Sequence, residues 1–227
     1  MSFLDHLNQL PLEKLMRRAA QANAADVQSA LGNGVRTLEE FSCLLSDAAK
    51  TRLEDIAHRA HALTLQRFGK TMQLFAPLYL SNECANICTY CGFSQDHQIA
   101  RRTLSVPEVS TEAALLHKEG FRHLLLVSGE HAKYVPVSYL ENAARALSAN
   151  FPSLSLEVAP LTEEQYRGLV AAGMDGLIVY QETYDRGAYA THHPKGRKRD
   201  FEWRLETPER GALTSKDTLA SSSFPNV

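Results

Sequence analysis

Residues 76–93 read APLYLSNECANICTYCGF, a short apolar run followed at once by three closely spaced cysteines. The run 76–80 has the length and composition of a strand that is buried on both faces of a sheet. Cys84, Cys88 and Cys91 follow it in the spacing C-x3-C-x2-C. Parallel α/β folds bind ligands beyond the carboxyl ends of their strands. The stretch therefore predicts a buried parallel strand that carries a thiol-rich loop at its carboxyl end.

The alternation of strand and helix continues along the chain as far as residue 180. Apolar runs predict three further strands, at 123–128, 154–160 and 175–180. Helices between them begin at capping residues such as Ser105 and Thr162, each followed three positions later by Glu or Gln. Regular βαβ units indicate an α/β protein, either a (β/α) barrel or an open doubly wound sheet.

The first 75 residues predict helices alone. An Ala-rich helix is expected from Leu12 to Leu31, where Gly32, Asn33 and Gly34 form a loop. Thr37 and Glu40 form a capping box, from which a long helix is expected to run towards Gly69. We therefore expect a helical region at 1–75, an α/β domain of βαβ units at 76–210 and a disordered Ser/Thr-rich tail at 211–227.

The overall composition argues against several classes of protein. With 24 basic and 26 acidic residues the net charge is −2, so no nucleic-acid partner is expected. No apolar stretch reaches the roughly 18 residues that span a bilayer, and the N-terminus lacks a signal-peptide core, so no membrane association is expected. We expect a cytoplasmic protein, in which clustered cysteines bind metal or do redox chemistry rather than form disulfides.

The number of clustered cysteines bears on the identity of the metal. A structural zinc site needs four ligands, and the candidates for the fourth, Cys43 and His97, give no familiar zinc-finger spacing. An iron–sulfur cube is held by thiolates, and three thiolates leave one iron open to a small molecule. The spacing favours an iron–sulfur cluster, with zinc and inert buried cysteines as the alternatives.

Polar residues also follow the other predicted strands. Ser128, Gly129 and Glu130 come after the second strand, Glu157 lies late in the third, and Glu182 follows the fourth. Because the carboxyl ends of parallel strands meet at one edge, we expect these residues to face the cysteines. Taken singly, a Gly beside an acid commonly ends a strand, and an acid at a strand end is often only a cap.

The cysteine motif resembles that of the radical S-adenosylmethionine (radical SAM) superfamily, because it follows the first strand of a βα repeat and has an aromatic residue before its third cysteine. The resemblance implies a TIM-type (β/α) barrel, a [4Fe–4S] cluster and S-adenosylmethionine. In that superfamily the methionine moiety chelates the open iron. An electron from the cluster then cleaves the sulfonium to give a 5′-deoxyadenosyl radical.

Further strings resemble the 2-iminoacetate synthase family of thiamine biosynthesis. They are LYLSNECANICTYCGFS, RRTL, EVAPLTEEQY, GLIVYQETYDR and HPKGRKRDFEWRLETPER. The resemblance implies cleavage of the Cα–Cβ bond of L-tyrosine to 2-iminoacetate and p-cresol, with a thiazole synthase and a flavodoxin or ferredoxin as partners. The alternatives are a related radical SAM enzyme that acts on another amino acid, and a metal-binding remnant without catalysis.

The same resemblance implies roles for individual residues. Cys84, Cys88 and Cys91 would bind the cluster, and the backbone of Tyr90 would contact the adenine. Ser128, Gly129 and Glu130 resemble a Gly-Gly-Glu element that binds the methionine amino group, with Ser in place of the first Gly. Glu182 resembles a residue that contacts the ribose, and Arg204 one that pairs with the methionine carboxylate.

Several of these residues have a simpler interpretation. The ring of Tyr90 equally fits packing beside the cluster, and Arg204 also fits a solvated run of charges, KGRKRDFEWR. Glu157 is a weak candidate for a substrate contact. Tyr184, Tyr189 and His193 are expected to pack within loops, and Cys43 to be a buried helical cysteine.

The family pattern stops after LETPER, at residue 210, and gives way to GALTSKDTLASSSFPNV. Only four strands are predicted, which is about half of a barrel. We therefore expect a truncated copy of the family fold. Made alone, such a chain is expected to assemble a cluster poorly and to turn over little tyrosine, because half a barrel leaves strand edges unpaired.

Overall fold

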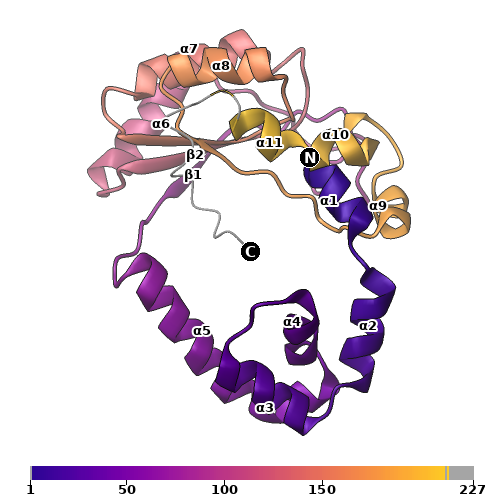
Figure 1. The fold of residues 1–227 in the computed structure, drawn as a ribbon. Helices are drawn as coiled ribbons and strands as arrows, with labels where there is room; N and C mark the ends of the chain where they lie inside the picture. Colours follow the sequence, from indigo (N-terminus) through magenta and orange to yellow (C-terminus); the bar gives the residue numbers. More distant parts are fainter. Residues whose placement is uncertain (1, 213, 215–227) are drawn as a thin grey trace. The chain divides into compact units, whose positions relative to one another are not determined.

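The structure is a computed structural model, and it describes residues 2–212 and 214. The chain divides into two compact units (Figure 1). One is a helical unit of residues 6–72, and the other, the sheet unit, joins residues 2–5 to the described residues from 73 onward. Most of the tail predicted to be disordered, at 213 and 215–227, lies outside the described residues.

The helical unit has more breaks than the sequence indicates. Its helices are α2 (Leu12–Gln21), α3 (Ala24–Asn33), α4 (Leu38–Leu44), the 3-10 helix η1 (Asp47–Arg52) and α5 (Leu53–Phe68), while α1 (Phe3–Gln9) begins in the sheet unit. The single helix expected over residues 12–31 is wrong. The side chain of Asn23 accepts hydrogen bonds from the N–H groups of Ala25 and Asp26, and it thereby starts a new helix.

The long helix expected after Thr37 is also interrupted. The capping box of Thr37 and Glu40 is confirmed, but α4 ends at Leu44. Ser46 is extended, and its hydroxyl donates to the carbonyl of Cys43 at 2.6 Å, which offers the backbone an alternative to the helical bond. Helix α5 does end at Gly69, whose φ of 69° lies in the left-handed region.

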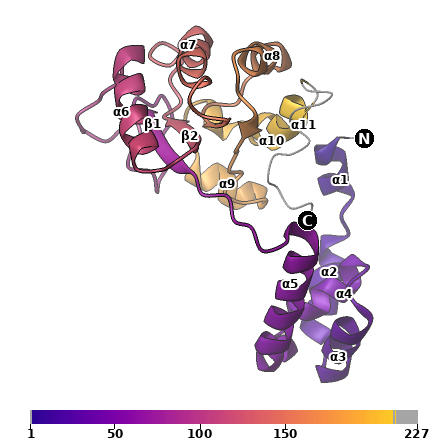
Figure 2. The ribbon, with the colours of Figure 1, turned by 90° about the vertical axis from the view of Figure 1, so that its left-hand side faces the viewer.

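Within the residues that the structure describes, the sheet unit contains four parallel strands in the order β1-β2-β3-β4. Their bounds are β1 (Ala76–Ser81), β2 (His123–Ser128), β3 (Ser153–Glu157) and β4 (Gly176–Leu177). The helices α6 (Val106–Lys118), α7 (Val137–Leu147) and α8 (Glu163–Ala171) connect them. These three helices lie on the same face of the sheet (Figures 1 and 2). A doubly wound sheet carries helices on both faces, so this arrangement matches part of a (β/α) barrel.

The core of the sheet unit fills the space between the strands and these helices. Leucines 124, 126, 154 and 156 of the sheet meet Leu140 and Leu147 of α7, and each of these side chains is almost fully buried. The capping boxes at Ser105–Glu108 and Thr162–Gln165 are confirmed. Burial of one leucine side chain contributes about 2 kcal/mol, so this layer stabilises the packing of the helices on the sheet.

Two strands are shorter than the apolar runs suggest. β3 ends at Glu157 instead of residue 160, because the chain bends at residues 158–159. Pro160 itself has no N–H to donate to a ladder. β4 covers 176–177 instead of 175–180, and its last ladder bond runs from Ile178 N to Leu156 O at 2.8 Å. Beyond this point the chain leaves the sheet and turns towards the candidate site. Helices α9 (Arg186–His192), η2 (Arg197–Arg199), α10 (Phe201–Leu205) and α11 (Thr207–Ala212) follow.

No helix within residues 2–212 is both long enough and apolar enough to cross a membrane.

Candidate radical SAM site

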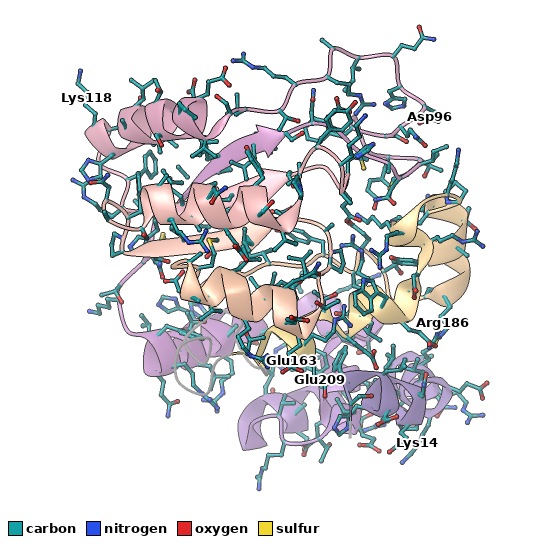
Figure 3. The ribbon with its side chains drawn as sticks, turned by 90° about the horizontal axis from the view of Figure 1, so that it is seen from above. Lys14, Asp96, Lys118, Glu163, Arg186 and Glu209 are labelled. Atoms are coloured by element: carbon teal, nitrogen blue, oxygen red, sulfur yellow. The ribbon has the colours of Figure 1, made fainter. Side chains whose placement is uncertain are left out.

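A cavity of about 260 Å³ opens at the carboxyl ends of the strands. In Figure 3 this end of the sheet unit lies towards Asp96, while Lys118, at the end of α6, marks the opposite end. All nine site residues expected from the sequence line the cavity: Cys84, Cys88, Tyr90, Cys91, Ser128, Gly129, Glu130, Glu182 and Arg204. The structure therefore brings together groups that lie up to 120 residues apart in the chain.

The three cysteines of the motif are free thiols. Burial raises the pKa of the Cys88 thiol to about 11, so at neutral pH only a bound cation would make it a thiolate. The Sγ of Cys91 accepts a hydrogen bond from the N–H of Phe93 at 3.4 Å. N–H donors of this kind tune the charge on a cluster sulfur. The donor set thus fits a metal group that binds thiolates.

A single ion and a cluster make different demands on these thiols. Within residues 2–212, no three His, Cys, Asp or Glu side chains converge closely enough to hold one metal ion. A cube makes a different demand, because each thiolate binds a separate iron at its own corner. Three thiols on one loop beside a cavity meet that demand.

Gly129 is the point where the second strand meets the cysteine loop. Its N–H donates to the carbonyl of Ser81 at 2.9 Å, and the neighbouring Glu130 carbonyl accepts from Ala85 N at 3.0 Å. A Cβ at Gly129 would lie 2.3 Å from the carbonyl oxygen of Glu83. Only glycine allows this approach, which gives a physical reason for the residue type at this position.

Arg204, which is buried, and Glu130, which is partly buried, form an ion pair in the wall of the cavity. Arg204 is 4% exposed, so its placement in a solvated run of charges is wrong. Its Nη1 also donates to the carbonyl of Tyr180 at 3.4 Å, while the other carboxylate oxygen of Glu130 accepts from Asn86 Nδ2 at 2.9 Å. Within the described residues the Nε of Arg204 is buried without a partner, and so is the Oγ of Ser128.

Glu182 and Tyr90 line the cavity beside Lys198. Glu182 has a φ of 71°, which is strained for a residue with a side chain, and its carboxylate pairs with Lys198 Nζ at 2.7 Å. Desolvation raises the pKa of the Tyr90 phenol. That phenol lies 2.6 Å from Nε2 of His193, whose Nδ1 lies 2.8 Å from the carbonyl of Tyr189. The carbonyl requires a proton on Nδ1, so Nε2 accepts from Tyr90.

The segment 192–198 holds the cysteine loop through hydrogen bonds. Thr89 N donates to His192 O at 3.1 Å, and Ile87 N donates to the carbonyl of Lys195 at 3.0 Å. The N–H of Lys198 donates to Asn86 Oδ1 at 3.0 Å. Sequence reasoning missed Asn86 and Lys198, because neither type stands out in a polar loop.

The weaker candidates separate into two groups. Glu157 does line the cavity, and desolvation by burial raises the pKa of its carboxyl group. Tyr184 instead packs edge-on against Phe3, with ring centroids 6.3 Å apart. Tyr189 is buried, but it lies in helix α9 and not in the loop expected for it. Cys43 is, as expected, a buried cysteine of a helix, α4, and its thiol donates to the carbonyl of Glu39 at 3.3 Å.

Comparison with known families agrees with this site. Residues 78–211 match the model of the radical SAM superfamily, over more than half of the chain. The chain belongs to the radical SAM superfamily. Membership implies a [4Fe–4S] cluster and S-adenosylmethionine as its cofactors.

Among curated proteins, this radical SAM chain is 48% identical over 209 residues to 2-iminoacetate synthase of Escherichia coli K12. The match covers 92% of the chain and 55% of that relative, so the chain spans about half the length of the relatives it matches.

Solved structures of radical SAM proteins share the fold. HydG, a maturase of [FeFe]-hydrogenase, superimposes with a TM-score of 0.85 at 26% identity, over 92% of this chain and 48% of HydG. Methylornithine synthase (PylB) gives a TM-score of 0.64 at 20% identity, over 89% of this chain and 56% of PylB. The expected α/β fold, a partial barrel of the radical SAM type with an N-terminal helical extension, is confirmed.

Proposed function

We propose that this protein is a radical SAM lyase that cleaves the Cα–Cβ bond of L-tyrosine to 2-iminoacetate and p-cresol, for the thiazole of thiamine. The gathering of the nine residues on one cavity carries the radical SAM part of the proposal. The substrate rests on the 48% identity to 2-iminoacetate synthase.

Cys84, Cys88 and Cys91 would hold the [4Fe–4S] cluster through their thiolates. When bound, the cluster supplies the electron that cleaves S-adenosylmethionine to a 5′-deoxyadenosyl radical. The loop holds its thiols beside the apolar ring of Phe93, which helps to exclude water from this side of the cavity.

The Glu130–Arg204 pair is suited to the amino-acid end of S-adenosylmethionine. An α-amino acid presents an ammonium and a carboxylate side by side, and the pair presents the complementary charges in a buried wall. Glu130 would accept from the ammonium, and the planar guanidinium of Arg204 would donate to the carboxylate. The buried Nε of Arg204, which has no partner within the described residues, is a donor available for this purpose.

The other residues of the cavity would hold the nucleoside end. Glu182 is fixed by Lys198 and would accept from the ribose hydroxyl groups. The backbone of Tyr90 would contact the adenine, while its ring is held by the hydrogen bond to His193. Ser128 and Gly129 would line the path to the cluster, where only a residue without a Cβ fits at position 129.

The product, an unstable imine, is expected to pass to a thiazole synthase, and a flavodoxin or ferredoxin is expected to supply the electron. We place these reactions in the cytoplasm. A related enzyme that acts on another amino acid is the alternative, as 3-methylornithine synthase of Methanosarcina barkeri is 28% identical over 178 residues.

Anaerobic reconstitution of the chain with iron and sulfide tests the proposal. We expect a partial yield of brown protein, with broad absorption near ~400 nm that is lost in Cys88→Ala and kept in the control Cys43→Ala. Incubation with S-adenosylmethionine, reductant and tyrosine should then release p-cresol in small amounts at most, because the chain covers 55% of its relative. Stoichiometric zinc without colour would favour a non-catalytic metal-binding protein. A coloured protein that cleaves another amino acid, or releases indole from tryptophan, would refute tyrosine as the substrate. The radical SAM part of the proposal would then stand.

A further inference from the structure

Arg101 binds residues 93–97, which follow the last cysteine of the motif, through several hydrogen bonds to main-chain carbonyl groups. Its Nη1 donates to Asn82 O at 2.6 Å and to Phe93 O at 2.9 Å. Its Nη2 donates to Ser94 O at 2.7 Å and to His97 O at 3.2 Å. One planar cation therefore joins the end of β1 to three carbonyl groups of residues 93–97.

The base of this loop is closed by other contacts. The side chain of Asn82 donates to Ala100 O at 2.8 Å and accepts from Arg102 N at 2.7 Å. The hydroxyl groups of Ser81 and Thr103 lie 2.7 Å apart. The two ends of the loop would therefore stay together without the guanidinium of Arg101. The hydrogen bonds of Arg101 instead hold residues 93–97, which lie between these ends.

The carbonyl groups that Arg101 binds are coupled directly to the cysteines. Ser94 is 1% exposed, and its Oγ accepts from the N–H of Cys88 at 3.0 Å. The N–H of Ser94 donates to the carbonyl of Cys91 at 3.0 Å, and the next N–H, of Gln95, donates to Asn86 O at 2.8 Å. A shift of residues 93–97 would thus move the backbone at two of the three thiols.

We propose that Arg101 is a positioning residue that arranges the three-cysteine loop before any metal binds. Tight turns leave carbonyl groups without backbone partners, and a charged donor satisfies them more strongly than a neutral one. A loop ordered in advance loses less conformational entropy when its ligand arrives. The identity of that ligand rests on the proposed function, but the order of the loop can be measured without it.

Hydrogen exchange on the metal-free, reduced chain tests the role of Arg101. The variants are Arg101→Ala, Arg101→Lys and the matched control Arg102→Ala. Arg102 is the adjacent arginine, but its side chain is 69% exposed and pairs with Glu108 on the surface. The amides that report on the loop are those of Ser94, Gln95 and His97, and the amides of β2 report on the sheet.

We expect the loop amides to exchange about tenfold faster in Arg101→Ala, with the amides of β2 within about twofold of the wild type. Arg102→Ala should match the wild type at both places. Arg101→Lys should remain several-fold faster than the wild type, because an ammonium keeps the charge and lacks the planar fork. After reconstitution, a chelator should remove iron about tenfold faster from Arg101→Ala than from Arg102→Ala.

Equal loop exchange in Arg101→Ala and Arg102→Ala would overturn the proposal. If Arg101→Ala fails to fold, Arg101→Lys decides: faster exchange confined to the loop supports a positioning role, and uniform acceleration, or none, refutes it. A wild-type chain that binds no iron would count against the proposed function and would leave the exchange comparison valid.

Discussion

Substitution of Gly129 by Ala should damage the cysteine loop from the side of β2. The added Cβ would lie 2.3 Å from Glu83 O, 2.9 Å from Glu83 C and 3.2 Å from the Cβ of Cys84. The closest atoms belong to the main chain, so no side chain can rotate away. Ordinary contact needs roughly 3.4 Å, so the backbone at Glu83 and Cys84 has to retreat by about 1 Å.

The cost follows from two contributions. Overpacking of this kind destabilises a protein by about 1–3 kcal/mol. The retreat also weakens the bonds Gly129 N to Ser81 O and Ala85 N to Glu130 O, at 2.9 and 3.0 Å, each of which contributes about 1 kcal/mol. We therefore expect Gly129→Ala to lower the free energy of unfolding of the sheet unit by about 2–3 kcal/mol.

Urea unfolding followed by tryptophan fluorescence measures this change. Trp203 is the single tryptophan of the chain and lies in α10, so its emission reports on the sheet unit. With a slope of about 2 kcal/mol per M, the midpoint should fall by roughly 1 M. The control is Gly92→Ala in the same loop, where an added Cβ meets no atom within 4 Å. Equal midpoints and equal iron content in the two variants would refute the reasoning.

Three further predictions concern other parts of the chain. Glu130→Gln leaves the guanidinium of Arg204 buried without its carboxylate and should lower the free energy of unfolding by about 3 kcal/mol, measured by the same fluorescence assay; no change would mean that the pair is not formed. Cys88→Ala should abolish the colour of the reconstituted chain and Cys43→Ala should keep it, with iron and sulfide analysis as the check. Hydrogen bonds from the Ser105 backbone and side chain lower the pKa of Glu108 from 4.5 to about 2, so the stability that this carboxylate contributes is present above pH 4.5 and is lost as the pH falls towards 2. Glu108→Gln should flatten acid unfolding in that window, and an unchanged profile would refute the assignment.

Local sequence was sufficient for much of the fold. The capping pairs at residues 105–108 and 162–165 begin the helices that they predict, and β1 and β2 occupy the expected apolar runs. Prediction from local sequence failed where a side chain that bonds to the backbone competes with an apolar pattern that favours a continuous helix. Asn23 caps a new helix within an Ala-rich stretch, and Ser46 binds the carbonyl of Cys43 where apolar spacing favours a continuous helix. A periodic pattern does not report such side-chain bonds to the backbone.

The sequence by itself determined that the cysteines and the polar residues after each strand share one end of a sheet, because parallel strands end at the same edge. Only the tertiary structure decided how they pair. The contact between Glu130 and Arg204 spans 74 residues, and the one between Asn86 and Lys198 spans 112. The bonds of Arg101 to its four carbonyl groups likewise depend on how one loop folds back on itself. Such contacts form only when the whole sheet unit brings distant segments within about 3 Å, and residue types alone carry no record of that geometry.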